Sequence, residues 1–155
     1  MENAYFAAGC FWGVEATFRK LQGVQDTSVG YMGGKNDNPT YQQVCTGKTG
    51  HAEAVMVTFD PTVIGYDHLL EVFWACHDPT TLNRQGPDVG SQYRSAVFYT
   101  STNQHNLAEE KLNEAQKNWR KTIVTEISKA GDYYQAEDDH QQYIEKQGMG
   151  SCRNR

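Results

Sequence analysis

The spacing of apolar side chains alternates along the chain between a pattern typical of strands and one typical of helices. A short apolar run, residues 4–8, ends at Gly9 and predicts a buried strand. From Phe11 the apolar residues recur at helical spacing until Gly23, which predicts a helix directly after that strand. The same criteria predict further strands at Val24–Met32, His51–Phe59, Ala96–Thr100 and Val124–Ile127, and further helices at Tyr66–Cys76 and Thr102–Lys121.

Two long polar stretches, 33–50 and 80–93, separate these elements and are predicted to be loops. Loops of this length rarely serve as mere connectors in a compact domain, so the first of them indicates a functional role. From Gly131 onward the chain is polar, dotted with aromatic residues, and predicted to be irregular.

The order of these elements predicts an α+β fold. Strand–helix–strand units that follow one another favour a two-layer sandwich with a mixed sheet, related to the ferredoxin-like or split βαβ plan. We expect one catalytic domain over residues 1–155, in which an irregular C-terminal segment, about 131–155, carries Cys152.

Composition narrows the classes of partner. A formal net charge of -5 and a pI near 5.5, with scattered Lys and Arg, argue against nucleic acid as the main partner. No apolar run approaches the roughly 18 residues of a membrane span, and the start of the chain does not resemble a secretory leader. The four cysteines are dispersed and form no CxxC pair, so we expect a cytoplasmic protein whose cysteines are reduced.

Cys10 is the first candidate for chemistry, because it lies at the predicted turn from strand to helix. A helix N-terminus offers unpaired N–H groups and a positive dipole end, which stabilise a thiolate. Gly9 is expected to clear a path to the sulfur. The alternative, a small buried hydrophobic cysteine, is the commoner case for a free cysteine, but these local features favour a nucleophile.

Glu53 is the second candidate. Strand periodicity puts it on the same face as Val55, Val57 and Phe59, where desolvation would raise the pKa of the carboxyl group and make it a proton donor. A carboxylate on an edge strand or paired with a lysine is the alternative.

Four further residues are ambiguous from their own surroundings. Asp88 beside Pro and Gly is typical of a turn, and Tyr41, Tyr93 and Trp12 are typical of packing. The histidines show no zinc-binding spacing, so no metal is expected.

Two functions of other classes remain open at this point. A cysteine hydrolase or acyltransferase would need a histidine base within hydrogen-bond reach of Cys10. A zinc- or thiol-binding module would need a ligand cluster, which the absence of CxxC disfavours.

Three motifs, in this order along the chain, resemble those of the methionine sulfoxide reductase A family: GCFWG at 9–13, GHAEA at 50–54 and HDPTTLNRQGPDVGSQYRSA at 77–96. The resemblance runs from about Phe6 through the last predicted strand. It implies that Cys10 is the catalytic cysteine and that Glu53 donates a proton. It also implies a methyl-binding pair, Phe11 and Trp12, and a set of residues around the sulfoxide oxygen, Tyr41, Asp88 and Tyr93.

The same resemblance implies a reaction cycle without a metal or organic cofactor. Methionine (S)-sulfoxide, free or within proteins, would be reduced at Cys10, which becomes a sulfenic acid. Cys152 would then form a disulfide with Cys10, and thioredoxin would reduce it. The tail sequence MGSCRNR departs from the family's usual pattern, and Cys45 and Cys76, interpreted as structural, are the other possible resolving residues. We expect a monomer that binds neither nucleic acid nor membrane.

Overall fold

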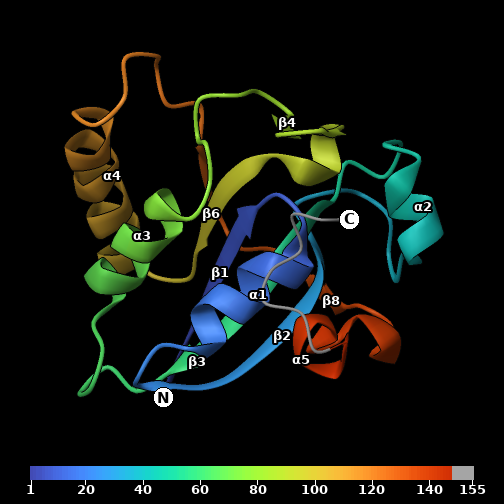
Figure 1. The fold of residues 1–155 in the computed structure, drawn as a ribbon, viewed down its shortest axis with the longest axis horizontal. Helices are drawn as coiled ribbons and strands as arrows, with labels where there is room; N and C mark the ends of the chain where they lie inside the picture. Colours follow the sequence, from blue (N-terminus) through green and yellow to red (C-terminus); the bar gives the residue numbers. More distant parts are fainter. Residues whose placement is uncertain (148–155) are drawn as a thin grey trace.

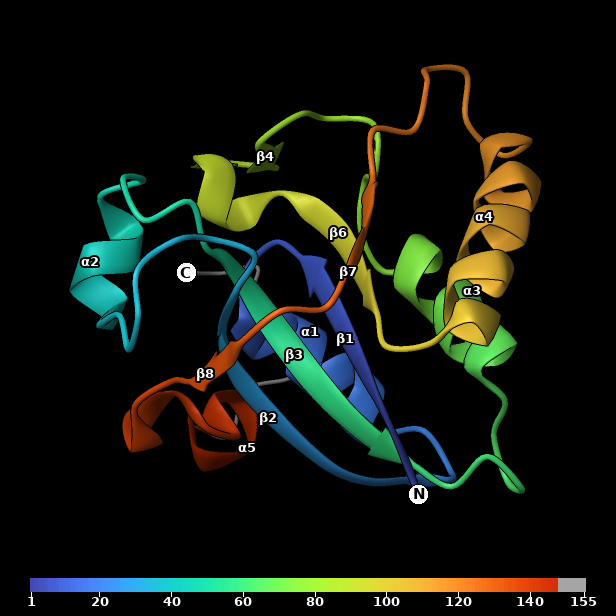
Figure 2. The same cartoon turned by 180° about the vertical axis from the view of Figure 1, so that it is seen from behind.

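The computed structural model describes residues 1–147 and contains a curled six-stranded sheet with the strand order β7-β6-β1-β3-β2-β8 (Figures 1 and 2). Its strands are β1 (Glu2–Ala8), β2 (Val24–Met32), β3 (Ala52–Phe59), β6 (Ser95–Tyr99), β7 (Glu126–Lys129) and β8 (Tyr133–Gln135). The helices of the described part are α1 (Phe11–Arg19), α2 (Tyr41–Cys45), α3 (Tyr66–Ala75), α4 (Thr102–Gln116) and α5 (Tyr143–Gln147).

The sheet confirms the predicted α+β class and mixed strand directions. Helix α1 connects β1 to β2, and β3 pairs antiparallel with both, which is the split βαβ arrangement. Strand β6 adds antiparallel to the other edge of β1, while β7 runs parallel to β6. The central position of β1 leads the chain directly from the middle of the sheet into α1.

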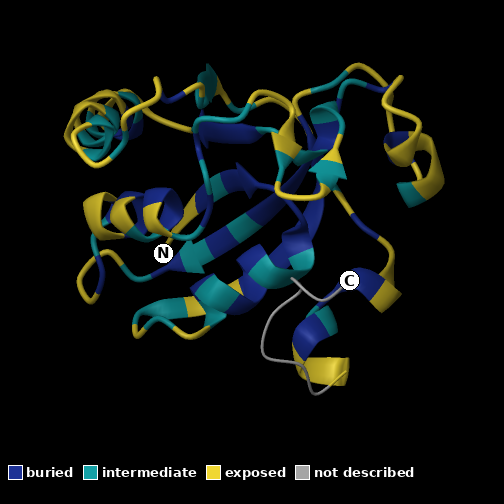
Figure 3. Ribbon diagram, turned by 45° about the horizontal axis from the view of Figure 1, so that its top comes forward, coloured by how far each residue is buried: buried dark blue, intermediate teal, exposed yellow. Residues whose placement is uncertain are grey.

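The main core lies between the sheet and the helices α1 and α3. Phe6 on β1 is fully buried and stacks on Phe18 of α1 and Phe73 of α3, with ring centroids 5.0 and 5.3 Å apart. The buried residues lie mainly in the strands and on the inner side of α1 (Figure 3). Such close aromatic packing fixes the helix axis relative to the strand, and therefore also fixes the N-terminus of α1.

The stretch 33–50, predicted to be a loop, contains the short helix α2. Thr40 caps this helix: its hydroxyl accepts a hydrogen bond from the backbone N–H of Gln43, whose side chain accepts one from the backbone N–H of Thr40. A helix this short has no apolar periodicity to detect, so the prediction of a loop is wrong here for a physical reason.

The stretch 80–93 also carries regular structure. It holds a small hairpin, β4 (Arg84–Gln85) with β5 (Asp88–Val89), followed by a 3₁₀ turn at Ser91–Tyr93. Strands of two residues are too short for an alternating pattern, so their pairing is fixed by the surrounding structure and not by their own sequence.

Helix α4 ends at Gln116, earlier than the predicted end at Lys121. The Gln116 side-chain amide donates hydrogen bonds to the backbone carbonyls of Trp119 and Lys121 and accepts one from the N–H of Ile123. These bonds stabilise the chain as it leaves the helix. The last predicted strand shifts toward the C-terminus in the same way, because the Val124 N–H bonds to the carbonyl of Pro79 and not to the sheet.

The segment after Gly131, predicted to be irregular, joins the sheet through β8 and then covers α1. The Gln141 side chain pairs with both backbone groups of Val29, and the backbone and side chain of Gln142 donate to the buried carboxylate of Glu15. This segment is therefore folded against the rest of the domain as far as Gln147, the last described residue. Cys152 lies outside the described residues.

A buried hydrogen-bond chain ties the end of α3 to the sheet. His77 Nδ1 donates to the carbonyl of Phe73, so the neutral ring accepts at Nε2 from the hydroxyl of Ser95 (both 2.7 Å). Ser95 in turn contacts the hydroxyl of Thr125, which accepts from the indole N–H of Trp74. In this buried site the neutral ring meets both of its hydrogen-bond partners, whereas a charged ring would be deprived of water and would have to reverse the bond to Ser95.

This arrangement predicts a stability loss in mild acid. Burial lowers the pKa of His77 to about 4, whereas the unfolded chain takes up the proton near 6.5. Between these values the unfolded state binds more protons, so the free energy of unfolding falls as the pH falls from about 6.5 to about 4, by up to about 1.4 kcal/mol per pH unit. Urea unfolding across this range should show the loss, and a His77→Gln variant should lack this component. An NMR titration that placed the His77 pKa near 6.5 would contradict the assignment.

Candidate active site

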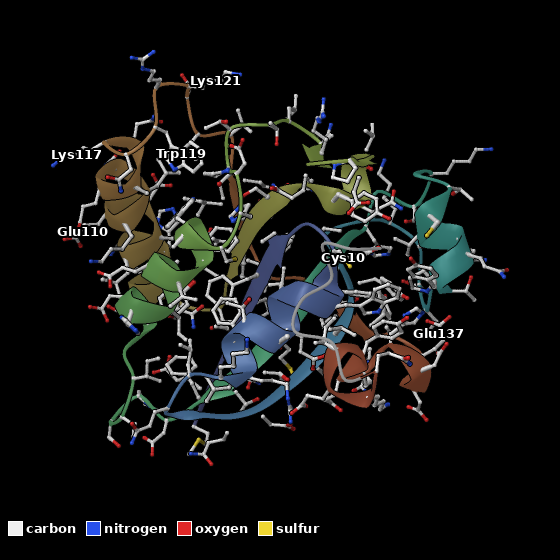
Figure 4. All side chains as sticks on the ribbon, in the orientation of Figure 1. Cys10, Glu110, Lys117, Trp119, Lys121 and Glu137 are labelled. Carbon is white, nitrogen blue, oxygen red and sulfur yellow. The ribbon has the colours of Figure 1, made fainter. Side chains whose placement is uncertain are left out.

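Cys10 is the N-cap residue of α1, at the end of the central strand β1 (Figure 4). Its side chain is buried, with 6% exposed. The first backbone N–H of the helix, that of Phe11, donates to Glu53 Oε1 at 3.2 Å. The carboxyl group of Glu53 therefore lies beside the residue that carries the thiol.

Gly9 has a structural role that differs from the expected path to the sulfur. Its φ of +97° lies in the region that favours glycine, and an added Cβ would approach Cβ and Cγ of Gln85 to 2.9 and 2.8 Å. The Gln85 amide is itself held by the backbone N–H and carbonyl of Asp78. Gly9 thus lets the chain turn sharply into α1 and lets the β4–β5 hairpin pack against that turn.

Glu53 lies on β3 with its side chain in the main core, as strand alternation predicts. It is 1% exposed, and Val55, Val57 and Phe59 on the same face are fully buried. In the register of β2 and β3 it stands opposite Tyr31, which is also fully buried. A carboxyl group in such surroundings is shielded from bulk water and close to the N-terminus of α1.

Tyr41 and Tyr93 bring two hydroxyl groups toward Glu53. Burial, and then the negative charge of Glu53, raise the pKa of Tyr41 above its ordinary value. The same two causes raise the pKa of Tyr93 to about 12, with smaller contributions from Cys45 and Cys10. Both hydroxyls therefore keep their protons near neutral pH and can donate hydrogen bonds.

An aromatic cluster lies on the other side of the α1 N-terminus. Trp12 stacks on Tyr143 with ring centroids 3.9 Å apart, and its indole N–H donates to His140 Nδ1 at 3.1 Å. The ring of His140 also contacts those of Phe11 and Tyr41, at 5.6 and 4.4 Å. Phe11 and Trp12 thus belong to an apolar wall that the C-terminal segment completes.

Asp88 lies on β5, opposite Gln85, in the hairpin that packs against Gly9. The hairpin therefore brings Asp88 to the same end of the molecule as Cys10. Sequence reasoning missed His140 and Tyr143, because they lie in a segment with no periodic pattern. Their aromatic character in the run HQQY was the only local signal.

The other described cysteines differ in their surroundings. Burial raises the pKa of Cys76 to about 12, so its thiol stays protonated and is a poor nucleophile. Cys45 is exposed at the end of α2. Partial burial raises the pKa of its thiol above the ordinary value, and hydrogen bonds with Tyr41 and Gln92 offset only part of this rise.

Within residues 1–147 no group of three or more His, Cys, Asp and Glu side chains is placed to hold a metal ion. Over the same residues, every helix is too short or too polar to cross a membrane.

A family model described as peptide methionine sulfoxide reductase matches residues 2–155. The chain belongs to this family. A reductase of the family from Methanothermobacter thermautotrophicus, named MsrA, is 60% identical over 153 residues, which are 97% of this chain and 90% of that relative.

Solved reductase structures share the fold. Reduced Mxr1 from Saccharomyces cerevisiae superposes with a TM-score of 0.90 at 35% identity, covering 97% of this chain and 88% of Mxr1. Mxr1 in complex with Trx2 superposes with a TM-score of 0.64 at 26% identity, covering 92% and 84%. Membership of the reductase family favours an oxidoreductase over the hydrolase or acyltransferase considered from the sequence.

The turn at Gly9, which places the reductase's Cys10, gives a testable prediction. Gly9→Ala should destabilise the fold by about 2–4 kcal/mol, through backbone strain and displacement of Gln85. Gly47→Ala is the matched control, because Gly47 also has a positive φ (+76°) but no other atom lies near its Cβ position. The free energy of unfolding of Gly47→Ala should fall by only about 1–2 kcal/mol, from backbone strain alone. Equal losses for the two variants in urea unfolding would show that the contact with Gln85 is unimportant.

Proposed function

We propose that Cys10 is the nucleophile with which this enzyme reduces methionine (S)-sulfoxide, free or within proteins. The observation that carries the proposal is the hydrogen bond from the Phe11 N–H to Glu53, which places a carboxyl group next to the N-cap thiol. The resemblance of the sequence motifs to the family supports the same assignment.

The first step forms a bond between the Cys10 sulfur and the sulfoxide sulfur. Attack by the Cys10 thiolate leaves negative charge on the sulfoxide oxygen, and Glu53 supplies a proton to that oxygen. The hydroxyls of Tyr41 and Tyr93 donate hydrogen bonds to the same oxygen, with Asp88 beside it. The protonated oxygen then bonds to the Cys10 sulfur as its bond to the substrate sulfur and the bond between the two sulfurs break. The electron pair of the sulfur–sulfur bond stays with methionine, which leaves, so the substrate is reduced and Cys10 is oxidised to a sulfenic acid.

Phe11 and Trp12 form the apolar seat for the methyl group of the substrate. Support comes from the stacking of Trp12 on Tyr143 and from its hydrogen bond to His140, which hold the indole in one orientation. A fixed apolar seat beside the thiol favours one arrangement of methyl group and oxygen, and therefore one sulfoxide epimer.

The enzyme is restored in two further steps. The Cys152 thiol condenses with the Cys10 sulfenic acid, which forms a disulfide and releases water. Thioredoxin then reduces this disulfide by thiol–disulfide exchange. The structure of the relative Mxr1 in complex with Trx2 supports thioredoxin as the reductant here.

We also propose that the chain is a single catalytic domain that acts as a monomer in the cytoplasm. Support for a single domain comes from the one six-stranded sheet, which joins strands from β1 to β8, and from the main core packed on it. No metal or organic cofactor takes part in the proposed steps. The polar, acidic composition is consistent with a cytoplasmic protein.

The nucleophile is tested by Cys10→Ser. A serine hydroxyl is not ionised near neutral pH and does not form the sulfenic acid, so release of methionine from methionine sulfoxide should fall to background. Cys76→Ser is the control, since the partly buried Cys76 thiol takes no part in the first step, and in a single turnover without reductant it should release methionine as the wild type does. Wild-type activity in Cys10→Ser would refute the nucleophile assignment.

The resolving residue is tested by Cys152→Ser. This variant should release about one methionine per enzyme and then stop in a thioredoxin-driven assay, because the sulfenic acid has no partner thiol. Mass mapping of the disulfide formed by the wild-type enzyme after one turnover should show Cys10 joined to Cys152. Sustained turnover of Cys152→Ser would instead transfer the resolving role to Cys45 or Cys76.

A further inference from the structure

We propose that Glu137 is a positioning residue, which holds the helix that carries Tyr41 at the distance from Glu53 that the reaction needs. The inference deepens the proposed function and rests on the role given there to Tyr41. Glu137 acts only through other residues of the protein. Its carboxylate accepts hydrogen bonds from Tyr31 on β2 and from Tyr41 on α2.

Helix α2, which carries Tyr41, has few anchors of its own. It has five residues, of which only Val44 is buried. The capping by Thr40 is local and does not connect the helix to the sheet. Since helices this short are unstable alone, the orientation of Tyr41 depends on contacts from outside α2.

Glu137 supplies such a contact. Its Oε2 accepts a hydrogen bond from the backbone N–H of Tyr41 at 3.1 Å, and its Oε1 accepts one from the hydroxyl of Tyr31 at 3.0 Å. The two oxygens of one carboxylate have a fixed separation. The pair of bonds therefore ties the start of α2 to the tip of the Tyr31 side chain.

Tyr31 is a rigid reference point. Its side chain is fully buried and packs against the ring of Phe11, with centroids 5.8 Å apart. On β2 it stands directly opposite Glu53 of β3. Glu137 thus fixes Tyr41 relative to the strand pair that carries the proposed proton donor.

The charge of Glu137 strengthens both bonds. Burial alone would raise the pKa of its carboxyl group, but hydrogen bonds, first among them that from the Tyr41 N–H, outweigh burial and lower the pKa. The group is ionised at neutral pH, and hydrogen bonds to an ionised acceptor are about twice as strong as neutral ones. Glu137 lies near α5, on the side of the molecule where α2 and Cys10 also lie (Figure 4).

The experiment measures the rate of methionine formation in a single turnover, without thioredoxin. Glu137→Ala should slow this step about tenfold, because Tyr41 is no longer held in its productive position. Glu137→Gln should restore most of the rate, since an amide oxygen can accept from the Tyr41 N–H while its NH₂ group donates to Tyr31. Asp139→Ala, which removes an exposed carboxylate from the same turn, should react like the wild type.

A second comparison separates positioning from general loosening of the fold. If Glu137 acts through the Tyr41 hydroxyl, then adding Glu137→Ala to Tyr41→Phe should lower the rate less than twofold further. An equal tenfold loss in both backgrounds, or a wild-type rate in Glu137→Ala, would overturn the inference. If Tyr41→Phe alone reacted like the wild type, the role proposed for Tyr41 would fail, and this inference with it.

Should Glu137→Ala unfold under the assay conditions, Tyr31→Phe carries the test. It removes only the hydroxyl that orients the carboxylate and leaves the buried ring in place. We expect a loss in the same direction of about threefold. A rate equal to that of the wild type in Tyr31→Phe would then overturn the inference.

Discussion

The left-handed turn at Gly9 is the constraint on which the site depends. It ends the central strand and starts α1 within two residues, so that Cys10 takes the N-cap position of the helix and the Phe11 N–H donates to Glu53 of β3. A residue with a side chain would strain this backbone and displace Gln85. The position of Cys10 is therefore set by the backbone, with the rigid core formed by Phe6 and its aromatic neighbours behind it.

Around this fixed point, the site is built from parts of unequal rigidity. Glu53 belongs to the sheet, and its position follows from the pairing of β2 and β3. Tyr41 lies on the short helix α2 and Tyr93 in the 3₁₀ turn at Ser91–Tyr93, where fewer buried groups hold the backbone. Hydrogen bonds to the C-terminal segment hold two residues of the site: Glu137 accepts from the backbone N–H of Tyr41, and His140 accepts from the indole N–H of Trp12. Rigid elements thus carry the thiol of Cys10 and the carboxyl group of Glu53, while the residues proposed to contact the substrate are held by the C-terminal segment.

The sequence predicts the rigid parts well, because each follows from a local pattern. Strand β2 has the predicted bounds, the helix after Cys10 begins where its apolar spacing begins, and Glu53 faces the core as strand alternation requires. The α+β class follows from the order of these elements. Sequence periodicity cannot reveal α2, which has one buried side chain, or the two-residue strands of the hairpin.

The hydrogen bonds between distant segments could not be predicted from the sequence, for a different reason. Trp12 and His140 are 128 residues apart, and Tyr41 and Glu137 are 96 apart, so no local pattern connects them. The segment from β8 onward is polar and carries these contacts on isolated side chains. Its course over α1 depends on single hydrogen bonds, such as those of Gln141 to Val29, which a pattern of apolar residues does not encode.

The distance in sequence between Trp12 and His140 also affects how the site forms during synthesis. A chain made only as far as β7 contains Cys10, Glu53 and all the strands that place them. It lacks the residues that hold Trp12 and tether α2, because these are added last. Because a domain generally folds as one unit, the contacts at Trp12 and α2 form only once the whole domain is available. A chain that ended before β8 would therefore keep the strands that place Cys10 and Glu53 but lose the contacts that hold Trp12 and α2.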